Sequence, residues 1–369
     1  MSSITVGTAV AVVAVGGYYR WLRSPSHGET EPKESEVAPW QLDLPCIDTT
    51  LQMARMAMLV YDDDCASPIK DKLVGGTGDV VKRLKEVAGE DTELWFYEAA
   101  GDTEAAVAFS PKNKRCTIMF RGTESRSDAI ADVMIFKKKL EGPNDSADDR
   151  PDVRVHSGFR GQYYGEVEKL TNDGHVSEAL KAKKGEVKEM ELEAALFQKV
   201  EKVLAFAPKT ELFVTGHSLG GALSVLCGIR LALKYPDKNV QVINFGCPKV
   251  GNWAFAQLVN SKANLCVHRV AHKNDVVARA PNVNYYHVGH TIQIDEAAEP
   301  HAFKWHAGCS YWTNWNPFIG LLQGGVGDHS MEPGYLAALN THKHDVKNED
   351  GSCSTTGEKP WVTAYKVAE

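Results

Sequence analysis

The sequence predicts an α/β protein with a mostly parallel central sheet that is flanked by helices. The main observation is a regular alternation of apolar strand-like and helix-like segments between residues 211 and 272. Such alternation is typical of a parallel sheet covered on both faces. In addition, no linker or fixed-period repeat interrupts residues 46–345, so we expect a single domain there. Hydrophobic and charged contents of 43% and 24% are those of an average globular protein.

The first part of this domain contains one helical and three strand-like segments. The spacing of apolar residues in 50–63 predicts a helix, and residues 92–99, 105–110 and 115–120 form short β-rich stretches separated by turn signals. We therefore expect neighbouring strands of one sheet. A helix is predicted over 161–170, and the Lys- and Glu-rich segment that opens residues 174–206 predicts a solvated helical insertion.

The alternating part predicts three strands and two helices, in the order strand 211–215, helix 221–235, strand 240–246, helix 252–259 and strand 265–272. Ligands of parallel α/β sheets gather at the carboxyl ends of the strands. The residues just after each strand are therefore the ones most suited to chemistry.

Charge and cysteine content exclude several classes of function. The net charge is −7, the isoelectric point is about 6.0, and no basic stripe is visible, which argues against a nucleic-acid partner. Eight cysteines show no C-x-x-C spacing, so the sequence predicts neither a zinc site nor a disulfide framework. Several lie in apolar stretches as buried free thiols, which favours a reducing compartment.

The two ends of the sequence differ from the body. Residues 4–19 are apolar or small throughout, and Arg20 and Arg23 follow them. This pattern predicts an N-terminal membrane anchor over 1–23 with the remainder on the cytoplasmic side, while a signal peptide of the secretory pathway is the alternative. Polar residues 24–45 predict a flexible tether, and residues 346–369 a C-terminal tail.

The stretch "VTGHSLGGALS" contains Gly216, Ser218 and Gly220 at the spacing G-x-S-x-G. It follows a predicted strand and opens a predicted helix, which is the context of a nucleophile elbow. The turn holds the serine in a strained conformation, and side chains at the two elbow glycines would strike the adjacent strand and helix. Ser218 is thus the candidate nucleophile.

A serine nucleophile needs a base and an orienting carboxylate, in the chain order Ser, Asp or Glu, His. Asp275 follows the strand 265–272 and is the candidate carboxylate. We select His329 as the base because it lies in a glycine-rich loop before a helix. His306 is the main alternative. The other histidines after Asp275 are His287, His290, His301, His342 and His344, of which the first two lie in a strand-like segment and are expected to be structural.

The oxyanion of the reaction needs two donors, one from the amide after the nucleophile and one from an earlier strand-to-helix loop. The first is the amide of Leu219. The strand 115–120 runs into "RGTE", which makes the amide of Thr123 the second candidate.

Six segments resemble motifs of the fungal-type (class 3) lipases, a branch of the α/β-hydrolases, in that family's order. They are "TIMFRGTES", "DVRVHSGF", "FVTGHSLGGALS", "INFGCPKVGN", "VHRVAHKNDVVARAP" and "GDHS". The resemblance implies a lipase domain over 46–345 that hydrolyses glycerolipid esters at a membrane or droplet surface. It implies Ser218, Asp275 and His329 as the catalytic residues and Thr123 with Leu219 as oxyanion donors. It implies no cofactor and no metal.

The same resemblance implies an amphipathic lid after the oxyanion strand. Its candidate apolar residues are Ile130, Val133, Met134 and Phe136, and Lys137, Lys138 and Lys139 behind them could favour an anionic surface. The fold does not define the acyl group, so a soluble carboxylesterase of feruloyl or short-chain type is the main alternative. A catalytically idle scaffold and a metalloprotein built on the histidines of 287–306 are weaker alternatives.

Overall fold

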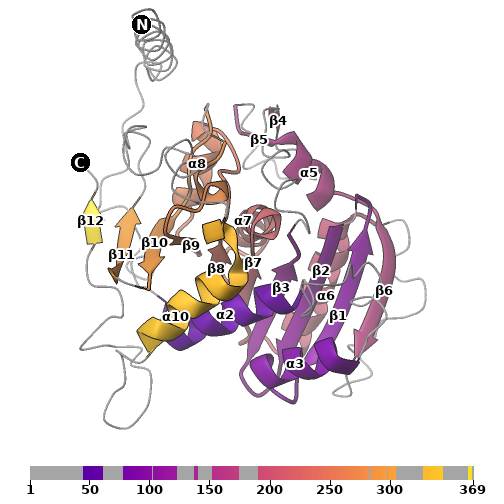
Figure 1. Cartoon of the computed structure of the whole chain (residues 1–369). Coiled ribbons are helices and arrows are strands. Elements are labelled where there is room, and N and C mark those ends of the chain that lie inside the picture. The colour runs from indigo at the N-terminus through magenta and orange to yellow at the C-terminus, as the bar shows by residue number, and fades with distance from the viewer. Residues whose placement is uncertain are drawn as a thin grey trace, which may run out of the picture.

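The computed structural model describes ten segments of the chain. The described residues are 45–60, 78–101, 103–122, 137–139, 152–173, 190–281, 284–296, 298–304, 327–343 and 365–367. They build a three-layer α/β arrangement around one large sheet (Figure 1).

Ten strands form the central sheet in the order β12-β11-β10-β9-β8-β7-β3-β2-β1-β6. The middle of the sheet, from β3 to β10, is parallel, and antiparallel pairs flank it on both sides. The strands are β1 Glu93–Ala99, β2 Thr103–Ser110, β3 Arg115–Phe120, β6 Val167–Asp173, β7 Glu211–Gly216, β8 Val240–Phe245, β9 Leu265–His272, β10 His290–Asp295, β11 Ala298–Lys304 and β12 Tyr365–Val367. A separate two-stranded sheet joins β4 Lys137–Lys139 to β5 Arg154–His156.

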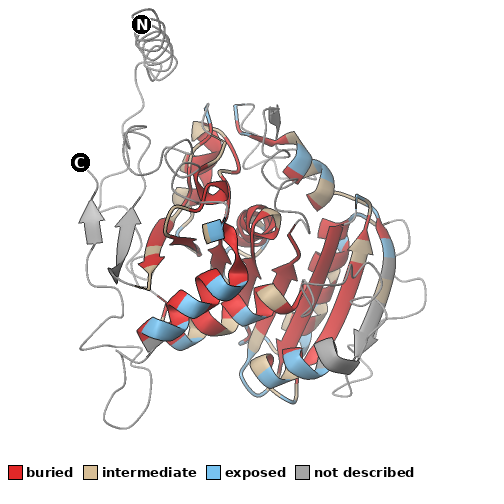
Figure 2. Cartoon of the chain, in the orientation of Figure 1, coloured by how far each residue is buried: buried red, intermediate tan, exposed pale blue. Residues whose placement is uncertain are grey.

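Helices cover both faces of the large sheet. On one face lie α5 Ser157–Tyr163, α6 Leu192–Phe206, α7 Leu219–Lys234 and α8 Trp253–Asn260. On the other lie α2 Ile47–Leu59, α3 Gly78–Ala88 and α10 Leu336–Lys343, with α2 and α10 side by side in Figure 1. Two apolar clusters, one on each side of the sheet, form the core, and Figure 2 shows burial concentrated in the central strands and α7.

The predicted alternation is confirmed. The three strands and two helices of 211–272 are β7, α7, β8, α8 and β9 in the predicted order, and the parallel pairing of β3, β7, β8 and β9 gives the expected fold class. Residues 92–99, 105–110 and 115–120 are the neighbouring strands β1, β2 and β3.

The predicted helix over 161–170 is wrong in its second half. Helix α5 ends at Tyr163, and the chain from Val167 onward forms β6, which pairs with β1. The turn between them includes Gly165, where an added Cβ would lie 3.0 Å from the backbone oxygen of Ala100. Pairing with the edge of the sheet thus overrides the local helical pattern.

Several predictions fall outside the described residues. These are the anchor over 1–23, most of the tether over 24–45, the charged insertion that begins at residue 174, Thr123 and the lid candidates Ile130, Val133, Met134 and Phe136. Three residues of the predicted tail, Tyr365–Val367, form β12. Among the helices of the described segments, none has the length and apolarity needed to span a bilayer.

Candidate active site

Ser218 lies in the sharp turn between β7 and α7. Its φ of 57° and ψ of −123° place a non-glycine residue in the left-handed half of the Ramachandran map, which costs free energy. The amide of Ser218 donates a 3.0 Å hydrogen bond to the carbonyl oxygen of Phe245 at the end of β8. The strained turn is therefore held against the neighbouring parallel strand.

The two elbow glycines permit the close approach of three backbone segments. A Cβ on Gly216 would strike the carbonyl group of Gly220, and a Cβ on Gly220 would strike the carbonyl oxygen of Phe120 at the end of β3. Because these neighbours are backbone atoms, they cannot rotate away. The turn thus excludes side chains at both positions, as the G-x-S-x-G spacing predicts.

Asp275 follows β9 and faces the same edge of the sheet as Ser218. Its Oδ1 accepts hydrogen bonds from the amides of Val277 at 2.8 Å and Ala278 at 3.2 Å, at the start of the 3₁₀ turn η4 Val277–Arg279. The carboxylate is 1% exposed. One oxygen is therefore fixed by the backbone, which leaves Oδ2 for a side-chain partner.

That partner is His329, whose Nδ1 lies 2.8 Å from Oδ2 of Asp275. His329 ends the 3₁₀ turn η5 Gly327–His329. The Tyr335 hydroxyl also donates a hydrogen bond to Oδ2. Burial by itself raises the pKa of Asp275, but the charge and hydrogen bond of His329, with the hydrogen bonds of Tyr335 and Ala278, outweigh it and lower the pKa below its usual range.

His329 also packs against the elbow, through the residue that precedes Ser218. The ring of His217, the residue before Ser218, is 4.5 Å from the His329 ring between centroids, and its Nε2 lies 2.9 Å from the His329 carbonyl oxygen. Within the described part of the chain, neither Oγ of Ser218 nor Nε2 of His329 has a hydrogen-bond partner, and both are buried. A hydroxyl and an imidazole nitrogen thus both remain available for chemistry.

Three of the other candidate histidines have described side chains, with interactions to groups outside the catalytic residues. His342 lies with its Nε2 2.8 Å from the carbonyl oxygen of Asp295. His287 and His290 are buried, and for His287 burial, together with the charges of Arg269 and Lys249, holds the pKa well below its usual value. The side chain of His301, in β11, and the whole of His306 and His344 fall outside the described residues.

The amide of Leu219 occupies the first position of α7. The amides of Gly221 and Ala222 donate to the Ser218 carbonyl at 3.0 and 3.3 Å, so the hydrogen-bond ladder of the helix begins after Leu219. The amide end of a helix carries partial positive charge. The Leu219 amide is therefore placed where an anionic oxygen bonded to a group on Ser218 could accept its hydrogen.

Two residues of the site were not predicted from the sequence. Gly246 follows β8 with φ of +57°, and a Cβ there would lie 2.8 Å from Cε1 of His329 and 2.9 Å from Oδ2 of Asp275. Tyr335 reaches the same carboxylate from the segment Met331–Tyr335. A glycine directly after a parallel strand is a signal that could have indicated Gly246, whereas nothing in the sequence singles out Tyr335 among twelve tyrosines.

Comparison with known proteins points to one family. A sequence model of the family described as Lipase (class 3) matches residues 117–285, which include β3, the elbow and Asp275. The lipase of Rhizopus niveus is 31% identical over 210 residues, which are 56% of this chain and 45% of that protein. The central part of the chain therefore resembles the class 3 lipases.

Another relative has a name that indicates a different activity. Phospholipase A1-Igamma1, chloroplastic, of Arabidopsis thaliana is 28% identical over 244 residues, 59% of this chain and 45% of that protein. The chain thus spans about half the length of these two relatives. Among solved structures, lipase II from Rhizopus niveus superimposes with a TM-score of 0.51 at 24% identity, over 67% of this chain and 80% of that one, which supports the fold.

Proposed function

We propose that this protein is a serine hydrolase that cleaves carboxylic ester bonds of acylglycerols or related glycerolipids through an acyl-enzyme. The observation that carries the proposal is the Asp275–His329 contact of 2.8 Å beside a serine held in an elbow turn. The family match and the names of the relatives support the glycerolipid substrate. No step of the mechanism calls for a metal or an organic cofactor.

In the proposed reaction, Nε2 of His329 accepts the Ser218 proton as Oγ attacks the ester carbonyl carbon. The ionised Asp275 accepts a hydrogen bond from the Nδ1–H group of His329, which selects the tautomer with a free Nε2 and stabilises the imidazolium that forms. The imidazolium then protonates the leaving alcohol, and the acyl group stays on Ser218. Water, deprotonated by His329, releases the fatty acid in a second addition and elimination.

The negative charge on the carbonyl oxygen needs donors that are already in place. The Leu219 amide at the start of α7 is the first proposed donor, and the Thr123 amide is the second. Strand β3 ends at Phe120, three residues before Thr123. The carbonyl oxygen of Phe120 lies close to Gly220 of the elbow. This contact between the end of β3 and the elbow supports the choice of Thr123 as the second donor.

The substrate surface is a further part of the proposal. The lid candidates Ile130, Val133, Met134 and Phe136 precede β4, and the three lysines of β4 would favour an anionic lipid surface next to the site. A soluble carboxylesterase is the competing function, because the same residues would cleave a dissolved ester.

Rates of hydrolysis on three kinds of ester test the function. Short-chain ester would be assayed below and above its solubility limit, beside emulsified long-chain acylglycerol and phospholipid vesicles, with Ser218→Ala as the inactive control. We expect the rate to rise steeply once an interface forms and to vanish in the variant. Activity confined to dissolved short esters would instead establish the carboxylesterase, and no activity in the wild type would contradict both.

The compartment in which the enzyme works is tested separately. Five cysteines of the described residues are free thiols, which supports the cytoplasmic placement that the predicted anchor implies. Carbonate extraction and protease protection of tagged full-length protein check this. Release into the lumen with loss of the first residues would support the secretory alternative.

A further inference from the structure

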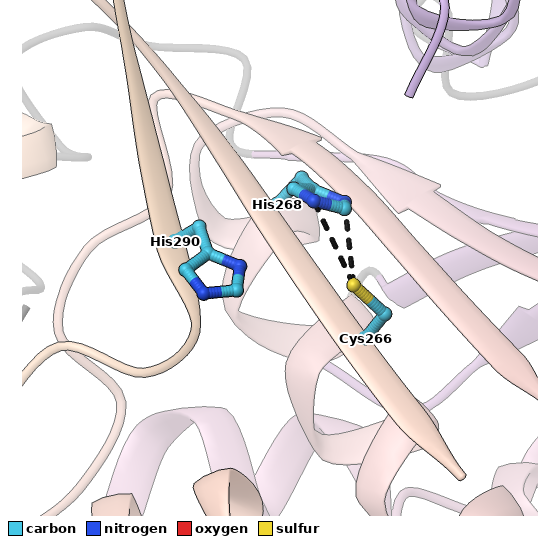
Figure 3. Close-up of side chains that lie close together, drawn as sticks. All are labelled: Cys266, His268 and His290. Carbon is cyan, nitrogen blue, oxygen red and sulfur yellow. Dashed lines mark hydrogen bonds between the residues drawn. The ribbon is translucent and has the colours of Figure 1, made fainter. Parts of the chain in front are cut away.

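Three buried side chains with metal-binding atoms lie together on β9 and β10, apart from the catalytic residues. Cys266 and His268 are two residues apart on β9 and therefore project from the same face of the sheet. His290, the first residue of β10, pairs directly with His268 in the parallel register. Figure 3 shows the cysteine sulfur next to the His268 ring, with the His290 ring beside it.

The distances between these atoms suit a shared ligand. Sγ of Cys266 lies 3.6 Å from both ring nitrogens of His268, and one ligand atom from each of the three residues lies within 4.8 Å of the other two. With metal–sulfur and metal–nitrogen bonds of about 2.3 and 2.0–2.1 Å, sulfur and nitrogen ligands of a tetrahedral cation lie about 3.6 Å apart. Small side-chain rotations would bring His290 to the same separation.

All three side chains of the cluster are buried. Cys266, His268 and His290 are 3%, 1% and 5% exposed. Farther along the same face, Val270 and Ile292 belong to the apolar cluster under α2 and α10.

The cluster is separate from the catalytic site. Asp275 follows the carboxyl end of β9, whereas Cys266 is the second residue of that strand. At roughly 3.3 Å per residue, Cys266 lies about 20 Å from His272 at the end of the strand. A ligand at the cluster would therefore act on the pairing of β9 with β10 and would not touch the reacting atoms.

We propose that Cys266, His268 and His290 form a structural site for a thiophilic cation, Zn²⁺ or Cu⁺. Thiolate and imidazole are the ligands that both cations prefer. On binding, the Cys266 thiol loses its proton to solvent and forms the sulfur–metal bond, while each imidazole donates one nitrogen lone pair. A monovalent cation would leave the buried site neutral, whereas Zn²⁺ would leave one positive charge. The cation links two neighbouring strands and so stabilises the folded state.

Metal titration of the purified full chain, stripped with a chelator, tests the site. Zn²⁺ and, under anaerobic reducing conditions, Cu⁺ are added against a competing chromogenic chelator, and Co²⁺ is added to detect a thiolate-to-cobalt charge-transfer band. We expect one equivalent of the preferred cation to bind tightly, the Co²⁺ band to appear, and the melting temperature to rise on metal addition. The rate of ester hydrolysis at 25 °C should not change.

Variants separate this site from other thiols in the chain. Cys266→Ser and His290→Gln should each lower the affinity at least tenfold, and Cys266→Ser should abolish the charge-transfer band. Cys46→Ser, which replaces the thiol that caps α2, is the matched control and should leave both unchanged. If Cys266→Ser does not fold, the metal affinity of His290→Gln alone tests the proposal. Equal affinity in wild type and His290→Gln, or no stoichiometric binding of either cation, would overturn the proposal.

Discussion

The Tyr335 hydroxyl donates a hydrogen bond to Oδ2 of Asp275, the same oxygen that lies 2.8 Å from Nδ1 of His329. Tyr335 is fully buried, and its ring lies against His217 and His272. Burial and the neighbouring carboxylate raise the pKa of Tyr335 well above its usual value, so the hydroxyl remains a donor. We therefore infer that Tyr335 positions the carboxylate of Asp275, which in turn positions His329, the proposed base.

Tyr335→Phe removes this hydrogen bond without changing the shape of the core. A hydrogen bond to a charged group contributes about 1.5–3 kcal/mol, so the free energy of unfolding should fall by that amount. We expect kcat to fall about tenfold, equivalent to about 1.4 kcal/mol, and KM to change little. Urea unfolding and steady-state kinetics measure both. Tyr97→Phe is the control, because its buried hydroxyl has no hydrogen-bond partner among the described residues; an equal loss of kcat there would contradict the positioning role.

Gly246→Ala should inactivate the enzyme. The new methyl group would lie 2.8 Å from the His329 ring and 2.9 Å from Oδ2 of Asp275, so the pair must move apart. A displacement of catalytic groups by about 1 Å lowers turnover on the order of 100-fold. The φ of +57° adds about 1–3 kcal/mol of backbone strain.

Gly161→Ala is the matched control for Gly246→Ala. Nothing lies within 4 Å of an added Cβ at Gly161, which is inside α5. Helical Gly→Ala changes stabilise by about 0.5–1 kcal/mol, so activity should be kept and the melting temperature should rise slightly. Full activity of Gly246→Ala in a parallel assay would rule out tight packing of that position on the catalytic pair.

Ser218→Gly should be more stable than Ser218→Ala although both are inactive. The φ of 57° and ψ of −123° are strained for alanine but accessible to glycine, which predicts a difference of about 1–3 kcal/mol in the free energy of unfolding. Loss of the nucleophile should reduce turnover on the order of 10⁶-fold in both. Equal unfolding free energies would show that the turn is relaxed in solution.

The stability difference between wild type and Glu296→Gln should depend on pH. Glu296 pairs with Lys273 and lies 3.3 Å from Nε2 of His272, whose Nδ1 is 3.0 Å from the carbonyl oxygen of Asp328, next to His329. Burial opposes ionisation, but these contacts lower the pKa of Glu296 to about 2, below the ordinary value of about 4.3.

A carboxyl with a depressed pKa stabilises the folded state above its unfolded pKa, and this contribution is lost as pH falls toward the folded pKa. The difference between wild type and Glu296→Gln should therefore be about 1 kcal/mol at pH 7 and should shrink between about pH 5 and pH 2. Urea midpoints across that range measure it. A constant difference between wild type and Glu296→Gln across that range would exclude the ion pair as its cause.

Much of the fold could be predicted because the parallel strands are short, mostly apolar and separated by segments with helical periodicity. Strand β7 and helix α7 illustrate this, since burial on both faces leaves a continuous apolar segment that local sequence reveals. Strand β6 could not be predicted in the same way. Its polar residues follow a helical stretch, and only pairing with β1 makes them a strand.

The site was predictable only in part, for a different physical reason. The elbow is a local signal, and the chain order of nucleophile, carboxylate and base narrows the choice of Asp275 and His329. The contacts of Gly246 and Tyr335 depend on how the ends of β8 and β9 meet a segment more than fifty residues away. Such contacts leave no periodic pattern in the sequence, and the three-dimensional structure is needed to see them.

The backbone packing around the elbow glycines has a consequence for enzyme engineering. Gly216 packs on the carbonyl group of Gly220 and Gly220 on that of Phe120, so main-chain atoms of α7 and β3 set the position of Ser218. Substitution of the Phe120 side chain leaves that carbonyl in place. Directed evolution of this enzyme toward new acyl groups should therefore accumulate its productive mutations in loops around the turn, while the nucleophile itself keeps the same coordinates through many generations.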